Sequence, residues 1–306
     1  MTMALLLVAL FPAVPAEASG RALIAVLMSY KNLPLEETLG GFKDYLKGHG
    51  AGADYELFSL QTSDKGPSSP RFNEEVRSKN FLLILALGSP AVEVAGRQGG
   101  GLPIVASMVL SEEDIRRVPN ATGVFLQFPL QTQFFWLHRI LPDAVNVGVV
   151  YNPAENGARI RSATRIAAGL GLTLVPREVS TPQQLPEALK SLANHADVLW
   201  GVSDNIVVTP QTARSILLFS FRNRIPFIGL STPWVKAGAF YALDRDYRDI
   251  GRQCAELARK VLNGAKAGAL APQPPRRVTF SLNLNTAERM KVEVPPSLRR
   301  EAEKLF

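Results

Sequence analysis

The chain has 306 residues, of which 46% are apolar and 20% are charged, and its formal net charge is +7. This length allows two domains of ordinary size, and the composition is that of a soluble globular protein, which excludes disordered and fibrous classes. Lysine and arginine are scattered singly or in pairs, with no basic tract that interleaves with aromatic residues. We therefore expect no nucleic-acid partner.

The N-terminal segment has the pattern of an export signal. Residues 3–14 are apolar, and Ala16-Glu17-Ala18 is the small-residue pattern at which signal peptides are cleaved. The stretch is shorter than the roughly 18 apolar residues that would suggest a membrane span. No lysine or arginine precedes it, which makes the signal atypical, and no cysteine follows to carry a lipid anchor. We expect residues 1–18 to be a signal peptide and the protein to be periplasmic.

From Arg21 onward, apolar runs alternate with segments of helical periodicity, which predicts parallel sheets flanked by helices. Expected strands lie at 21–28, 55–60, 81–87, 103–108, 123–128, 146–151, 172–179, 198–202, 226–230, 238–243 and 278–282. The helices between and after them are expected at 35–47, 72–79, 134–140, 154–169, 185–193, 211–223, 246–263 and 296–306. The second half thus repeats the architecture of the first.

Motifs of the common enzyme classes are absent from the sequence. It contains no G-x-G-x-x-G, G-x-x-x-x-G-K-[ST], H-E-x-x-H or G-x-S-x-G. The three histidines lie in expected helices or at their ends, and the single cysteine, Cys254, is also helical. A general base would have to be Asp204 or Asp244, with no orienting partner visible. We expect no catalytic residue, no metal and no cofactor.

Polar residues follow three consecutive expected strands: Ser203-Asp204-Asn205 after 198–202, Ser231-Thr232-Pro233-Trp234 after 226–230, and Asp244 after 238–243. In open parallel sheets, ligands bind outside the carboxyl ends of the strands. This edge therefore predicts a small-molecule site.

Two of these residues have alternative interpretations. Asp204 could receive an ammonium group, with Asn205 fixing its direction, or it could cap the helix that follows. Trp234 could stack on a planar ligand, or it could pack between the two halves of the protein.

The order of elements resembles the ABC transporter substrate-binding proteins of the tryptophan/tyrosine-binding type, which have a periplasmic-binding-protein-like fold. The resemblance is carried by Ala196-Asp197-Val198, Ser203-Asp204-Asn205, Ile225-Pro226-Phe227, Val235-Lys236-Ala237-Gly238-Ala239, Asp246-Tyr247, Gly251-Arg252-Gln253, Leu262-Asn263-Gly264, Asn285-Thr286-Ala287, Leu141-Pro142-Asp143-Ala144 and Tyr151-Asn152-Pro153. It extends from about residue 121 to the C-terminus and is weaker before that.

This resemblance implies a fold and a domain arrangement. The fold is α/β and two-lobed, of type I, with each lobe a parallel sheet flanked by helices and a hinge of three crossings near Leu126, Leu243 and Gln273. The N-terminal lobe would comprise 19–125 plus 244–272, and the C-terminal lobe 126–243 plus 273–306.

The resemblance also implies ligand contacts at other strand ends. Gly88-Ser89 opens a helix whose free N–H groups would receive a carboxylate, although Ser89 could equally be a plain helix cap. Ser29 and Tyr30, at the end of the first expected strand, depart from the His-Pro that is more common in the family; from this position Tyr30 could stack across the cleft from Trp234. The tip at Ser107 lacks the family's Asp-Pro pair, so the ligand need not be that of its relatives. The candidate ligand-binding set is Ser29, Tyr30, Gly88, Ser89, Ser107, Tyr151, Asn152, Asp204, Asn205, Ser231, Trp234 and Asp244.

The resemblance finally implies a function. We expect a monomeric solute-binding protein of an ABC importer that captures a small amino-acid-like or aromatic ligand between its lobes and delivers it to a permease in the inner membrane. Two alternatives remain open: a periplasmic ligand sensor for a membrane kinase or chemoreceptor, and an enzyme that uses Asp204 as its base.

Overall fold

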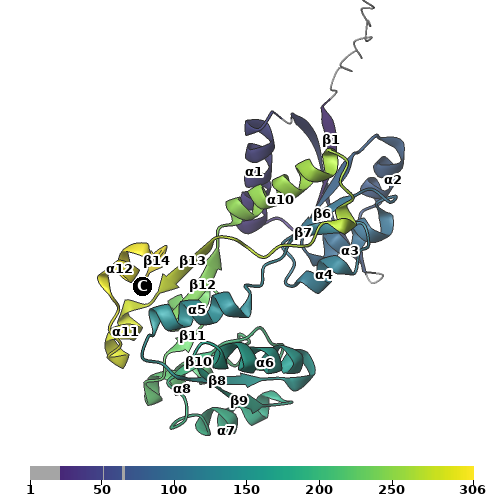
Figure 1. Ribbon diagram of the computed structural model, residues 1–306. Coiled ribbons are helices and arrows are strands. Elements are labelled where there is room, and N and C mark those ends of the chain that lie inside the picture. The colour runs from purple at the N-terminus through teal and green to yellow at the C-terminus, as the bar shows by residue number, and fades with distance from the viewer. Residues whose placement is uncertain (1–20, 51, 64–65) are drawn as a thin grey trace, which may run out of the picture.

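The computed structural model describes residues 21–50, 52–63 and 66–306, so the predicted signal peptide at 1–18 lies outside the described residues. The described chain forms two lobes, each built around its own sheet (Figure 1). Over these ranges no helix combines the length and the apolar character that crossing a membrane requires.

The first lobe contains a parallel five-stranded sheet in the order β2-β1-β5-β6-β7. Its strands are β1 (Ala22–Met28), β2 (Ala53–Ser59), β5 (Leu83–Leu87), β6 (Ile104–Ser107) and β7 (Ala121–Val124). Every residue of β5 is buried, and alternate residues belong to the cores on opposite faces of the sheet. Helices therefore cover both faces, as a continuous apolar strand requires.

Helices from both halves of the sequence cover this sheet. One face packs against α1 (Leu33–Gly48) and α10 (Tyr247–Leu262). The other packs against α2 (Pro70–Ser78), α3 (Ser89–Gln98) and α4 (Glu112–Arg116). A short hairpin of β3 (Gln61–Ser63) and β4 (Gly66–Ser68) and the short helix η2 (Ala267–Ala269) complete the lobe.

The contact between α1 and α10 joins segments about 200 residues apart, and Figure 1 shows the two helices side by side. The helices touch through glycine. A Cβ atom at Gly41 would collide with the backbone of Arg248, and one at Gly251 would collide with the backbone of Thr38. Only glycine permits so close an approach of two backbones. Cys254 of α10 is fully buried in the core beneath these helices, and burial raises the pKa of its thiol to about 12.

The second lobe contains a seven-stranded sheet in the order β14-β13-β12-β11-β10-β8-β9. Its strands are β8 (Asn146–Tyr151), β9 (Thr173–Glu178), β10 (Val198–Trp200), β11 (Phe227–Ile228), β12 (Tyr241–Arg245), β13 (Val278–Leu282) and β14 (Lys304–Leu305). The pairings are parallel except that β13 runs antiparallel to β12. The fold prediction is thus confirmed, with one antiparallel pair in the second sheet.

Helices again cover both faces of this sheet. Core residues of α5 (Leu130–Ile140), α6 (Pro153–Ala168), α11 (Leu284–Met290) and α12 (Pro296–Glu301) pack on one face. Those of α7 (Leu185–Lys190), α8 (Ala213–Asn223) and α9 (Thr232–Ala237) pack on the other, with the short helix η1 (Pro182–Gln184) before α7.

The chain passes between the two sheets three times, after β7, between β12 and α10, and between η2 and β13 (Figure 1). The crossings contact one another. Arg245 Nε donates a hydrogen bond of 2.6 Å to the backbone oxygen of Leu126, and Gln273 pairs with Val124 as an isolated bridge. The lobe boundaries of 19–125 plus 244–272 and 126–243 plus 273–306 remain our proposal.

The C-terminal segment differs from the expected helix at 296–306. The helix ends at Glu301, and residues 304–305 instead join the sheet beside Ser281 and Leu282. Hydrogen bonds from the backbone N–H of Leu284 to the Phe306 oxygen (2.7 Å) and from the N–H of Phe306 to the Leu282 oxygen (3.0 Å) hold this end. So short a strand has no detectable period, and tertiary pairing decides its conformation.

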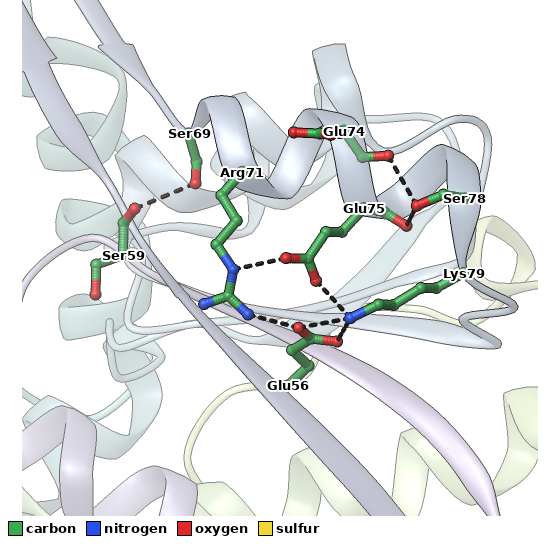
Figure 2. Close-up of polar contacts among 8 residues, drawn as sticks. All are labelled: Glu56, Ser59, Ser69, Arg71, Glu74, Glu75, Ser78 and Lys79. Carbon is green, nitrogen blue, oxygen red and sulfur yellow. Dashed lines mark hydrogen bonds and ion pairs between the residues drawn. The ribbon is translucent and has the colours of Figure 1, made fainter.

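An ion network attaches α2 to the edge strand β2 of the first lobe. Figure 2 shows Arg71 and Lys79 placed between the carboxylates of Glu56 and Glu75. The pKa of Glu75 is lowered to about 2 by hydrogen bonding within this group, with Glu56 first and then with Lys79 and Arg71. A carboxylate that is more acidic in the folded than in the unfolded chain stabilises the fold above its unfolded pKa.

We predict that Glu75→Gln flattens the acid dependence of stability. In the natural protein, the free energy of unfolding falls as the pH is lowered from about 4.5 to about 2, because folding opposes protonation of Glu75. The variant lacks this contribution. Urea-unfolding midpoints at pH 5, 4 and 3 measure it, and Glu74→Gln, whose exposed side chain forms no ion pair, is the control. Identical pH profiles for the Glu75 variant and the natural protein would contradict the prediction.

Candidate functional site

A pocket of about 240 Å³ lies where the carboxyl ends of β10, β11 and β12 meet the first crossing between the lobes. Its wall includes Ser203 and Leu230, which follow β10 and β11, and Leu126 from the crossing. Leu110, which follows β6 of the first lobe, completes that side. The edge of the sheet that the sequence indicates as a ligand site is therefore hollowed, and the first lobe contributes to the hollow.

Aromatic rings make up much of the wall. Trp200, Phe128 and Tyr241 line the pocket and are almost fully buried. The indole N–H of Trp200 donates a hydrogen bond of 3.1 Å to Gln133 Oε1, which fixes the ring. Flat, rigid rings with few rotatable bonds suit an apolar or aromatic ligand.

Two arginines also line the pocket, and each lies over an aromatic ring. The guanidinium of Arg159, on α6, lies 5.9 Å from the centre of the Trp200 ring, and that of Arg245 lies 4.9 Å from the centre of the Phe128 ring. Burial lowers the pKa of Arg159 to about 10 and lowers that of Arg245 as well. Both remain cations at neutral pH, so the pocket is positively charged.

The lining contains no aspartate, glutamate or histidine. Throughout residues 21–50, 52–63 and 66–306, no cluster of three or more such side chains is placed to hold a metal ion. The Tyr241 hydroxyl has no hydrogen-bond partner within these ranges, and burial raises the pKa of this group. The pocket thus offers cations, aromatic faces and a phenol, which is the chemistry of an anion receptor.

The carboxylate of Asp204 is hydrogen-bonded within the protein, to groups that follow β8 and β10. Its carboxylate accepts hydrogen bonds from Asn152 N (2.7 Å) and the Asn156 side chain (3.0 Å), and from the backbone N–H groups of Ile206 (2.9 Å) and Val207 (3.0 Å). The residue is 7% exposed and does not line the pocket. With four donors already bound, this carboxylate joins the loops after β8 and β10. It does not cap the following helix, because α8 begins only at Ala213 and its N-cap residue is Thr212.

The neighbouring candidates Tyr151, Asn152 and Asn205 have similar local roles. The Tyr151 hydroxyl donates a hydrogen bond of 2.7 Å to Glu178, and burial together with this carboxylate raises its pKa to about 12. The Asn152 side chain caps α6 through Ala154 N, at 3.1 Å. None of the three lines the pocket.

The candidates of the first lobe gather at the start of α3. Ser29 Oγ accepts a hydrogen bond of 2.9 Å from Ala91 N and so caps this helix from the neighbouring strand. Gly88 precedes the helix with a φ of 98°, a conformation that favours glycine. Ser89 and Tyr30 are exposed at this edge, and the pocket includes neither.

Ser107, at the end of β6, turns its hydroxyl into the protein interior. The residue is fully buried, and its Oγ donates a hydrogen bond of 3.1 Å to the backbone oxygen of Val124. This hydroxyl therefore joins β6 to β7 and is not presented to the cleft between the lobes.

The remaining candidates lie around α9. Trp234 is partly buried and packs against the core of its own lobe, with its ring centre 5.7 Å from that of Phe227. Asp244 accepts hydrogen bonds from Thr232 Oγ1 (3.0 Å) and Arg245 N (2.9 Å). Ser231 is the residue before α9, and its hydroxyl makes no capping bond.

Trp200, Arg159 and Arg245, which line the pocket, were not singled out from the sequence as candidate ligand contacts. Trp200 stands inside the expected strand 198–202, where an aromatic residue normally indicates core. Arg159 is one of several arginines on α6, and nothing in the sequence separates it from the exposed Arg161. Arg245 is the one residue of the three that the sequence could have indicated as a pocket residue, because it follows the expected strand 238–243 at a predicted crossing.

The fold is that of a type I two-lobed solute-binding protein. It has two mainly parallel sheets, three crossings between them, and a pocket at the first crossing. The family model described as ABC transporter substrate binding protein matches residues 23–306, and the chain belongs to this family.

Individual relatives are distant. A tyrosine-binding protein of Clostridioides difficile (strain R20291) is 24% identical over 231 residues, which are 72% of this chain and 66% of the relative. The alignment thus spans just under two thirds of that protein's length.

Solved structures agree in fold. A ligand-free, open substrate-binding protein with adhesive properties from Clostridium difficile has a TM-score of 0.76 at 19% identity, over 92% of this chain and 98% of that one. A Streptococcus pneumoniae domain in complex with L-Trp has a TM-score of 0.61 at 17% identity, over 94% and 100%. At these identities the likeness shows the fold alone.

We predict that Asp204→Asn destabilises the protein by about 1–3 kcal/mol, because an amide nitrogen replaces an oxygen that accepts backbone N–H groups in a buried loop. Chemical denaturation measures the loss. Asn205→Ala, at the exposed neighbour, is the matched control and should be close to neutral. A variant as stable as the natural protein that had lost ligand binding would instead assign Asp204 to the ligand.

Proposed function

We propose that this chain is the exported solute-binding protein of an ABC importer, which captures a small amino-acid-like or aromatic ligand between its lobes and delivers it to a permease in the inner membrane. The observation that carries the proposal is the pocket at the first crossing, where strand ends of one lobe meet Leu110 of the other. A ligand held there would favour the closed arrangement of the lobes, because it would contact both.

The ligand class is supported by the pocket and by the relatives. Three aromatic residues, Phe128, Trp200 and Tyr241, line a volume suited to a small molecule. One relative is named for tyrosine binding, and a structural neighbour was solved with L-Trp. Membership of the substrate-binding family supports the delivery step.

The surroundings of Asp204 do not support the enzyme alternative. Asp204 accepts four hydrogen bonds from its own loops and lies outside the pocket lining. A carboxylate so engaged is poorly placed to accept a substrate proton.

We predict that a thermal-shift screen finds a stabilising ligand among amino acids and small aromatic acids. A ligand at about 100 times its dissociation constant stabilises the folded protein by about 2.7 kcal/mol, which raises the melting temperature measurably. Sugars and purines serve as the comparison set. Stabilisation by sugars alone would contradict the proposed ligand class.

We also predict that ligand binding changes the fluorescence of one particular tryptophan. Trp200 lines the pocket, whereas Trp136 packs against Phe280 with ring centres 5.0 Å apart, outside the lining. Trp200→Phe should abolish the ligand-dependent change in emission, and Trp136→Phe should keep it. Loss of the change in the Trp136 variant alone would place the ligand elsewhere.

A further inference from the structure

The pocket lining contains two cations, and one of them has no partner of opposite charge among the described residues. The lining includes Arg159 and Arg245 and no acidic side chain. Arg245 is hydrogen-bonded to the Leu126 oxygen, and its Nη1 lies 4.0 Å from Asp244 Oδ1. Arg159, by contrast, forms no hydrogen bond and no ion pair with any residue in 21–50, 52–63 or 66–306, and its one described partner is the Trp200 ring.

An unpaired, largely buried guanidinium is costly unless something compensates it. A cation withdrawn from water loses hydration, and the fall in the Arg159 pKa to about 10 reflects this loss. The ring of Trp200 at 5.9 Å compensates part of the cost. Five N–H donors remain for an external partner, and the fork of a guanidinium matches a carboxylate in a bidentate manner.

The pocket has no counterpart for a ligand ammonium group. Asp204 is the candidate acid for receiving an ammonium group. Its carboxylate instead accepts four hydrogen bonds from neighbouring residues of the protein, and it does not line the pocket. Asp244 accepts from Thr232 and from the Arg245 backbone. An amino-acid zwitterion would bring its ammonium close to the unpaired guanidinium of Arg159, with no carboxylate in the lining to receive it, which is unfavourable.

We propose that the ligand is a small monocarboxylate with an aromatic or other planar body and no ammonium group, and that Arg159 holds its carboxylate. This inference rests on the proposed function and narrows it. The planar body lies among Trp200, Phe128 and Tyr241. The hydroxyl of Tyr241, which has no partner among the described residues, is an additional donor in the same lining.

Two matched series test the ligand class by isothermal titration calorimetry on the full protein. The first is indole-3-propionate, L-tryptophan and tryptamine, and the second is 3-phenylpropanoate, L-phenylalanine and 2-phenylethylamine. Within each series the body is the same, and only the charged groups change. In at least one series the carboxylate without an ammonium should bind at least tenfold more tightly than the amino acid, and neither amine should bind.

The outcomes separate this inference from the proposed function. If an amino acid binds and its deaminated analogue shows no tenfold advantage in either series, the inference is overturned and the proposed function stands. If no compound of either series binds, both the inference and the proposed aromatic ligand are overturned.

Variants test the role of Arg159 with the carboxylate that binds. Arg159→Gln should weaken that carboxylate at least tenfold and leave the corresponding uncharged amide, indole-3-propionamide or 3-phenylpropanamide, within twofold of its affinity for the natural protein. Arg161→Gln, two residues along the same helix, exposed and outside the lining, is the matched control and should change neither. Equal effects of Arg159→Gln on acid and amide would overturn the assignment. Urea unfolding checks the fold, which should not weaken, because the substitution removes an unpaired charge.

Discussion

The close packing of α10 against α1 is the constraint on which the two-lobed arrangement depends. Ile250, Cys254 and Leu257 of α10 fill one face of the first sheet, so the first lobe has no complete core until residues far along the chain return to it. Glycines 41 and 251 let the two helices touch through their backbones. The chain must leave the first lobe, return to it and leave it again. Three crossings therefore lie between the lobes, and the pocket forms beside the first of them.

Acidic and basic side chains have different tasks around the site. The acids near the strand ends satisfy backbone groups: Asp204 binds the loops after β8 and β10, and Asp246 accepts from Asp249 N to cap α10. The cations face the hollow, over aromatic rings. Loop geometry thus depends on carboxylates, and the electrostatic field of the pocket depends on guanidinium groups.

Sequence reasoning went further for the fold than for the site. Buried strands such as β5 and the amphipathic α10 follow from apolar periodicity, and the hollowed edge follows from the strand order. The direction of a side chain at a strand end does not follow, because it depends on which neighbour supplies a partner. Asp204 and Trp234 therefore look like ligand contacts in the sequence, whereas the first is bound by loop donors and the second packs beside Phe227.

Arg245 belongs to the hinge and to the pocket at the same time. Its Nε fastens the second crossing to Leu126 of the first, and the same side chain forms part of the pocket wall beside Phe128. Selectivity and hinge mechanics are therefore not independent traits in this protein. A substitution that reshapes this wall also alters the pivot of the lobes, so evolution or engineering of a new ligand preference here has to proceed through Arg159 and Trp200 if the pivot is to be conserved.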